Sequence, residues 1–261
     1  MSLTVQAPDL NAERRHPPRP ADDRGGFIGV DRGLAAFAVA ATADGTEVGR
    51  FEAPRPLRGS LVRLRRLSRQ ASRARPRSHN RAKATRRMSR QHARIANVRR
   101  TFLHEVSSQL VKTHDRLAVE DLAVANLMTN RHLARAIGDA AWAELARQLT
   151  YKAAWFGTEL VICDRWFAST RTCSGCGVVR RHLRLAERIL RCAGCGLVID
   201  RDRNAAANLA AWAERSIAQA PDRQAGGRVI NAPGGNGAGR RLGDGGTDPM
   251  NGEPTRTPSP A

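Results

Sequence analysis

Aromatic side chains are scarce in this sequence, at 4% of its 261 residues, and long apolar runs are missing. No stretch approaches the roughly eighteen apolar residues of a membrane-spanning helix, and the amino terminus lacks the apolar core of a signal peptide. Cysteine is also rare, at five residues. We therefore expect a cytoplasmic protein, in which cysteines bind metal more readily than they form disulfides.

Acidic residues are outnumbered, because 44 Lys and Arg stand against 24 Asp and Glu and leave a net charge of +20. Segment 55–100 has no acid at all, whereas it carries sixteen arginines and Lys83. A solvated helix face usually mixes both signs, so this segment is predicted to follow a phosphate backbone, which arginine binds through paired hydrogen bonds. The candidate nucleic-acid-binding residues are Arg63, Arg65, Arg66, Arg69, Arg73, Arg86, Arg87, Arg90, Arg94, Arg99 and Arg100.

Helical periodicity runs through the basic segment. Leucines recur at every third residue from Leu61 to Leu67, and Pro76 interrupts the pattern. Apolar residues at helical spacing resume between Lys83 and Leu110. We expect two helices that together form an Arg-rich insertion over residues 55–112.

Four of the five cysteines form two Cys-x-x-Cys pairs, Cys173 with Cys176 and Cys192 with Cys195, separated by fifteen residues. This is zinc-ribbon spacing, and we expect the ribbon to occupy residues 168–199. Four thiolates complete a tetrahedral site, so the zinc is predicted to be structural. Cys163 lies in an apolar run and is expected to be a small buried side chain.

Strands and helices alternate in the rest of the chain. Short apolar or alternating runs predict strands over 27–30, 34–41 and 46–51, and two further strands begin near residues 116 and 159. Helical spacing of apolar residues predicts a helix that runs from about Trp142 to Phe156 and stops at Gly157. The expected class is therefore α/β.

Acids follow several of these strands. Asp31 ends the first one, Glu120 and Asp121 end the strand that begins at 116, and Asp164 ends the strand that begins at 159. Strand ends are where α/β proteins place their chemistry. Next to Asp164, Trp166 and Phe167 could stack on nucleobases, or they could belong to the core.

A further pair of acids opens the last predicted helix, in the segment Asp200-Arg-Asp202-Arg-Asn204. Asp202 suits the N-cap or the first turn, where it could cap the helix or bind a cation. Together with Asp31 and Glu120, it could hold two Mg²⁺ ions about 4 Å apart for hydrolysis of a phosphodiester. The competing acids are Asp121, Asp164 and Asp200.

Several segments resemble the signature segments of one family. These are GVDRG at 29–33, AVEDL at 118–122, TCSGC and CAGC in the predicted ribbon, and DRDRNAAANL at 200–209. ARIANVRRTFLH and YKAAWFGTELVICDRWFASTRTC look like the same family. It comprises the TnpB/OrfB proteins of bacterial insertion sequences, RuvC-like and RNA-guided DNA nucleases related to type V CRISPR effectors. The resemblance covers about 27–215.

The resemblance implies an RNase H-like (RuvC) mixed sheet with flanking helices, in which the Arg-rich helices bridge toward guide RNA and DNA. It also implies that Asp31, Glu120 and Asp202 are the catalytic magnesium ligands, which favours Asp202 over Asp200. It predicts a DNA-binding and RNA-binding endonuclease that acts in transposition and DNA recombination near the bacterial nucleoid.

One departure concerns length. Family members usually carry a sizeable region before the GVDxG strand, whereas residues 1–26 here are polar and are predicted to be a disordered leader to the 27–220 core. Residues 221–261 contain ten Gly and six Pro and are predicted to be a disordered tail. On this basis the chain is expected to be truncated and impaired in guided cleavage, unless a partner protein supplies the missing function.

Two other functions stay open at this point. The chain could be a non-catalytic DNA- or RNA-binding regulatory remnant that keeps the charge and the ribbon. It could also be a plain zinc-ribbon adaptor for nucleic acid, in which case the three acids would be incidental.

Overall fold

The computed structural model describes residues 15–17, 19–20, 22–23, 25–184, 187–219 and 230–231. Its centre is a six-stranded mixed sheet with the strand order β3-β2-β1-β4-β5-β8. The strands β1, β2 and β3 are antiparallel, whereas β1, β4, β5 and β8 run parallel. The sheet strands are β1 (Ile28–Arg32), β2 (Ala38–Thr42), β3 (Glu47–Phe51), β4 (Arg116–Glu120), β5 (Glu159–Cys163) and β8 (Ile230–Asn231).

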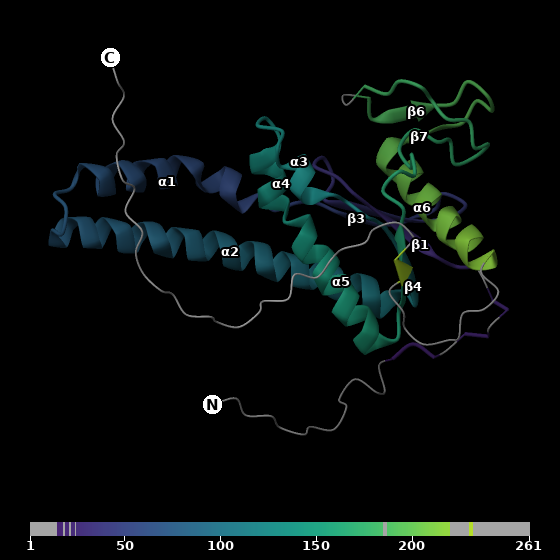
Figure 1. Cartoon of the computed structure of the whole chain (residues 1–261), viewed down its shortest axis with the longest axis horizontal. Helices are drawn as coiled ribbons and strands as arrows, with labels where there is room; N and C mark the ends of the chain where they lie inside the picture. Colours follow the sequence, from purple (N-terminus) through teal and green to yellow (C-terminus); the bar gives the residue numbers. More distant parts are fainter. Residues whose placement is uncertain are drawn as a thin grey trace, which may run out of the picture.

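Helices connect the parallel strands and cover both faces of the sheet (Figure 1). They are α1 (Pro56–Arg73), α2 (His79–Thr113), α3 (Val124–Leu127), α4 (Ala134–Ala140), α5 (Trp142–Phe156) and α6 (Arg201–Ala218). None of the helices in the described part of the chain combines the length and the apolar character that a membrane crossing requires.

The two faces of the sheet have separate cores. Side chains such as Val30 and Leu117 pack with α2 and α5 on one face, while Phe27, Ala118 and Val161 pack with α6 on the other. Successive residues of a strand point to opposite faces, so each parallel strand contributes to both cores. This explains why these strands are apolar at nearly every position.

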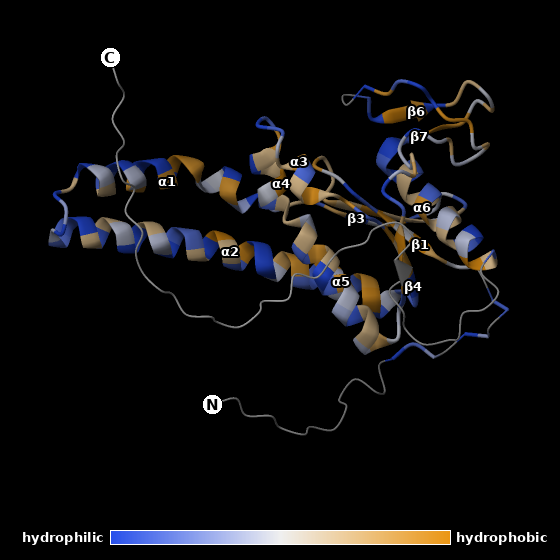
Figure 2. Ribbon diagram, in the orientation of Figure 1, coloured by the Kyte–Doolittle hydropathy of each residue, from blue (hydrophilic) through white to orange (hydrophobic). Residues whose placement is uncertain are grey.

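Helices α1 and α2 lie side by side and extend away from the sheet as a hairpin (Figure 1). Figure 2 shows that this hairpin is mostly hydrophilic, whereas the strands are hydrophobic. Its base is held by Asp139, whose carboxylate accepts hydrogen bonds from the backbone N–H groups of Leu57 and Arg58 at the start of α1 and pairs with Arg99 at 2.8 Å. The hairpin is therefore tied to α4 at one end.

Most predicted element boundaries are confirmed within a few residues, and α5 ends at Gly157 as predicted, where φ is 70°. Strand β2 starts later than expected because residues 33–37 form a turn closed by the bond from Gly33 N–H to the Phe37 carbonyl. Helix α2 starts earlier than expected because Ser78 caps it by accepting a hydrogen bond from the Arg81 N–H.

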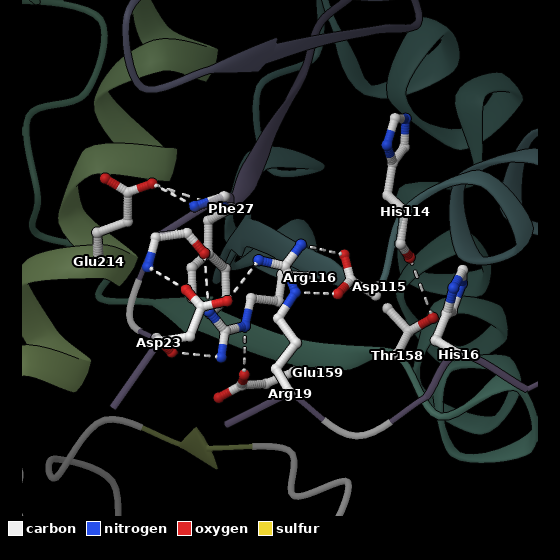
Figure 3. Close-up of polar contacts among 12 residues, drawn as sticks. His16, Arg19, Asp23, Phe27, His114, Asp115, Arg116, Thr158, Glu159 and Glu214 are labelled. Atoms are coloured by element: carbon white, nitrogen blue, oxygen red, sulfur yellow. Dashed lines mark hydrogen bonds and ion pairs between the residues drawn. The ribbon is translucent and has the colours of Figure 1, made fainter. Parts of the chain in front are cut away.

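The prediction of a disordered leader is wrong for its described residues from Arg15 to Gly26, which lie along the sheet edge where β4 and β5 begin (Figure 3). Arg116 donates to the carbonyls of Asp23 and Gly25, each at 2.7 Å, and to the Glu159 carboxylate at 3.0 Å. A buried guanidinium needs such partners, and the leader supplies two of them. Periodicity cannot reveal a segment held by polar contacts.

The predicted Gly/Pro-rich tail lies outside the described residues, apart from β8. The backbone of that short strand adds to the sheet beside β5, with Ile230 opposite Val161.

Candidate metal and nucleic-acid site

Strand register brings Asp31 and Glu120 to the same place. Val30 on β1 is paired with Val119 on the parallel strand β4, so the two acids stand one residue further along neighbouring strands. Val30 and Val119 face α2 and α5, and the alternation of side chains turns both acids toward the α6 face.

Helix α6 carries Asp202 to this face. Its close approach depends on Gly29, since a side-chain carbon there would lie 1.9 Å from the carbonyl oxygen of Ala206. Asp202 lies in the first turn of α6 and is 6% exposed, like Asp31. One carboxylate oxygen of Asp202 lies 3.8 Å from the position that a side-chain carbon at Gly33 would take. The turn after β1 therefore faces Asp202.

The carboxylates repel one another. Burial, followed by the charges of Asp202 and Glu120, raises the pKa of Asp31 to about 8. Burial also raises the pKa of Glu120, although the charge of Arg32 lowers it. A buried acid whose pKa is raised by burial and by two neighbouring carboxylates is in the electrostatic condition that a bound cation relieves.

The three competing acids have other partners. Asp121 pairs with the exposed Arg165, and Asp164 accepts a hydrogen bond from the backbone N–H of Trp166 at 2.7 Å. Asp200 is the N-cap of α6, where it accepts the Arg203 N–H at 3.0 Å. Because Asp200 caps the helix, Asp202 has no capping role.

Arginines line this site in ways that the sequence analysis missed. Arg32 is buried, and it donates to the carbonyls of Glu120 and Trp142. The guanidinium of Arg201 pairs with the Asp202 carboxylate, with 3.3 Å between Nη2 and Oδ1. Among the described residues, the buried side-chain nitrogens without a hydrogen-bond partner are Arg32 Nε and Trp142 Nε1. The GVDRG segment contains Arg32, but a basic residue after a strand does not by itself indicate burial.

The predicted convergence of the four cysteines is confirmed: their Sγ atoms all lie within 4.8 Å of one another and could hold a metal ion. Both glycines that follow the pairs, Gly177 and Gly196, have a φ of 77°. This left-handed backbone lets the chain turn back on itself directly after each Cys-x-x-Cys pair. Hydrogen bonds from the backbone lower the pKa of Cys192 to about 6, whereas burial raises the pKa of Cys173, so of these two thiols Cys192 forms a thiolate more readily. The remaining strands, β6 (Ile189–Arg191) and β7 (Val198–Asp200), form a two-stranded sheet that carries the second pair.

Two asparagines of α6 hold the ribbon beside the acids, and sequence reasoning did not identify them. Asn204 accepts the Ser174 N–H at 2.9 Å and donates to the Thr172 carbonyl at 2.7 Å. Asn208 donates to the carbonyls of Thr172 and Ser169. Both are almost fully buried, and their polar side chains among alanines were the available signal.

The candidate arginines lie on the hairpin, and all are exposed except Arg99. Arg99 is half-buried and bound to Asp139, so it is less available to a phosphate than the others. Within the described ranges, the other ten have no ion pair with an acid, and Glu105 is the one acid on α1 and α2. A cavity of about 170 Å³ at the base of the hairpin is lined by Phe37, Phe102 and Arg58, among others, and lies apart from the carboxylates.

Two family models match the chain in succession. The first, OrfB_IS605, described as "Probable transposase", matches residues 9–131, and the second, "Cas12f1-like, TNB domain", matches residues 142–209. The chain belongs to the TnpB/OrfB family.

Relatives agree with this assignment. A protein of Streptomyces pristinaespiralis, named "Putative RNA-guided DNA endonuclease", is 43% identical over 192 residues, which is 74% of this chain and 46% of that protein. InsQ of Escherichia coli K12 carries the same name and is 32% identical over 207 residues, 74% of this chain and 50% of that protein. The chain thus spans about half the length of these relatives.

Two solved structures share the fold. One is titled as a Cas12f1-sgRNA-target DNA complex, with a TM-score of 0.51 and 17% identity over 70% of this chain and 49% of that chain. The other is titled as a CRISPR-Cas12f ternary complex, with a TM-score of 0.57 and 15% identity over 79% of this chain and 41% of that chain. At these identities the likeness concerns the fold alone.

Proposed function

We propose that this chain carries a RuvC-like, metal-dependent DNA nuclease site on an RNase H-like core, with Asp31, Glu120 and Asp202 as the ligands of two Mg²⁺ ions. The observation that carries the proposal is the arrival of these acids, from β1, β4 and α6, on one face of the sheet. The mixed sheet and the names of the relatives support it.

The donor set fits magnesium. Carboxylate oxygens are the hard ligands that Mg²⁺ prefers, and burial, followed by the charges of Asp202 and Glu120, raises the pKa of Asp31, so a bound cation would favour its ionised form. The three carboxylates do not form a cluster as tight as the four cysteines of the described chain. Two ions about 4 Å apart share some oxygens and take others separately, so their ligands need not all meet at one point.

Each residue then has a definable part. Bound Mg²⁺ would supply Lewis-acid stabilisation of the phosphodiester oxygens and lower the pKa of a water. Asp31 and Glu120 would hold their ligand oxygens rigidly at adjacent strand ends, while the first turn of α6 orients Asp202. Arg32 would fix the backbone of Glu120 through its carbonyl.

The hairpin arginines, which we infer to bind DNA and guide RNA, would place the backbone of the nucleic acid near this site. Phosphate contacts carry no base information, so on their own they do not select a target. We therefore propose that this chain by itself binds nucleic acid and nicks single strands weakly, and that cleavage does not depend on a guide match. The test incubates the chain and its guide RNA with a plasmid that matches the guide and with one that does not, and measures cleavage of each. Cleavage that depends on the match would contradict the proposal.

The nuclease proposal is tested with Asp31→Asn, Glu120→Gln and Asp202→Asn, assayed with Mg²⁺ and with Mn²⁺. Asp121→Asn is the matched control, since Asp121 follows Glu120 but pairs with Arg165. We expect each of the first three to abolish nicking while nucleic-acid binding persists. A wild-type chain that binds but never cuts, with either ion, would favour the regulatory binding function instead.

A further inference from the structure

Trp166 is the most exposed large apolar side chain among the described residues, with 86% of its surface open to solvent. Single aliphatic residues on a surface are common, but an exposed indole offers a large flat apolar face, and each Å² left in water forgoes roughly 25 cal/mol of burial energy. Trp166 is therefore a candidate contact for a planar group. The alternative of a core position is excluded.

Trp166 lies at the edge of the sheet that also carries Asp31 and Glu120 of the candidate metal site. Strand β5 ends at Cys163, which is paired with Glu120 of the parallel strand β4, and Trp166 follows directly in the connection to the ribbon. Because β1, β4 and β5 are parallel, their carboxyl ends lie at one edge of the sheet. Trp166 thus leaves the same edge as Asp31 and Glu120.

The residues on both sides of Trp166 are anchored. Arg165 donates a hydrogen bond to Asp121, with 2.9 Å between Nε and Oδ2. The backbone N–H of Trp166 donates to the Asp164 carboxylate. Phe167 turns inward and packs beside Trp212 of α6, with ring centroids 6.3 Å apart. The backbone of this turn is therefore fixed, while the indole projects outward. Only the two side-chain torsions of the indole then remain to be ordered when it binds.

We propose that Trp166 is a stacking platform for an unpaired base of a single-stranded nucleic acid that enters the carboxylate site. This inference rests on the proposed function and adds a positioning residue to it. Stacking of a base on an aromatic ring is tolerant of sequence, because every base has a π face. The hairpin arginines would hold the phosphates, and Trp166 would hold the strand at the sheet edge.

The test measures binding of a fluorescein-labelled oligo(dT) and of a duplex of equal length in buffer without Mg²⁺ or Mn²⁺ and without a chelator, so that cleavage is not supported and the ribbon keeps its metal. Trp166→Ala is expected to weaken binding of the single strand by roughly fivefold to a hundredfold, the range for one stacked base, and to leave duplex binding unchanged. Trp166→Phe should keep most of the affinity but lose the quenching of tryptophan fluorescence on binding.

The matched control is Trp155→Ala. Trp155 is 52% exposed near the end of α5, which leads into the start of β5 and so lies toward the opposite edge of the sheet. Its replacement should change neither affinity. Equal single-strand affinity of Trp166→Ala and wild type, an equal loss for duplex, or a change of oligomeric state would each overturn the inference. Trp166-dependent binding without any nicking in Mg²⁺ would count against the nuclease site alone.

Discussion

The carbonyl oxygen of Ala206 lies 1.9 Å from the position that a side-chain carbon at Gly29 would occupy, so β1 and α6 are in backbone contact. The backbone nitrogen of Ala210 would be only 2.7 Å away. This contact sets the distance between two carboxylates, since Asp31 follows Gly29 on its strand and Asp202 precedes Ala206 on its helix. Any group larger than hydrogen must push the helix away.

Gly29→Ala is therefore expected to destabilise the protein by about 3 kcal/mol or more, at the upper end for overpacking, because the colliding atoms are backbone. Nicking should be lost at temperatures where the variant is still folded. Gly49→Ala is the control, since its side-chain carbon would meet side chains and no backbone: the Phe51 ring at 3.4 Å and the Ala40 Cβ at 3.8 Å. Thermal unfolding of both variants checks this, and equal melting temperatures would refute the close-contact account.

Asp31→Asn is expected to stabilise the metal-free protein as pH rises. The folded pKa of Asp31 is about 8, above its ordinary value of 3.8, so the folded state binds the proton more tightly and the wild type loses stability between these values as pH increases. Each pH unit within that window lowers the free energy of unfolding of the wild type by up to about 1.4 kcal/mol. Melting temperatures in buffer without Mg²⁺, and without a chelator that would remove the ribbon metal, should therefore diverge by several degrees between pH 5 and pH 8.

Addition of Mg²⁺ gives the complementary result. The cation should raise the melting temperature of the wild type at pH 8 and have less effect on Asp31→Asn, since one ligand is neutral. A parallel dependence of both proteins on pH and on Mg²⁺ would contradict the electrostatic account of this site.

One zinc per chain is expected on metal analysis, and Cys192→Ser should lose it. The ribbon has a small core of its own around Leu190, so metal loss should unfold the ribbon locally and lower the melting temperature. Cys163→Ala is the control, since Cys163 is buried against α6 and lies outside the cluster. Zinc content that falls equally in both variants would contradict the assignment.

Asp139→Ala should loosen the hairpin. Asp139 caps α1 and pairs with the half-buried Arg99, so its removal is expected to cost about 1–2 kcal/mol, or roughly 2–8 °C in melting temperature. Asp139→Asn retains an acceptor for the α1 N–H groups and should cost less. Limited proteolysis near residue 55 would report the freed hairpin, and unchanged cleavage there would argue against this attachment.

Binding of nucleic acid should fall steeply with salt. Replacing Arg86 and Arg90, which lie one turn apart on the exposed surface of α2, with glutamine should reduce the slope of log K against log salt by about 0.9 for each duplex phosphate that is no longer neutralised. Arg147→Gln is the control, since Arg147 is exposed but paired with Glu144. If the Arg86 and Arg90 double variant has the same slope as the wild type, these hairpin arginines do not bind phosphates.

Much of the fold follows from local patterns. The strand and helix periods between Phe27 and Phe156 are visible because alternation and helical spacing depend on near neighbours. The boundaries that differ are those set by turn hydrogen bonds, such as the turn from Gly33 to Phe37. The described leader was missed because polar contacts of Arg116 hold it, and no periodicity marks them.

The candidate site was visible in its residue types but not in its assignments. Six acids at strand and helix ends were all plausible, and spacing alone did not separate Asp200 from Asp202. The fold separates them because Asp200 is used as the N-cap and Asp202 points into the buried face. Arg32, Asn204 and Asn208 could not be placed, because their partners are distant in sequence.

The sequence by itself determined the positive hairpin and the elements of the α/β core, because each depends on residues within a few positions of one another. It also determined the zinc-ribbon spacing, because each Cys-x-x-Cys pair is local and only fifteen residues separate the two pairs. Only the tertiary structure decided which acids share a face, that Arg99 is held by Asp139, and that Trp166 stands in solvent while Phe167 is packed. The physical reason is that strand register and the contact of α6 with Gly29 join residues from opposite ends of the core sequence, and no local pattern encodes such a long-range pairing.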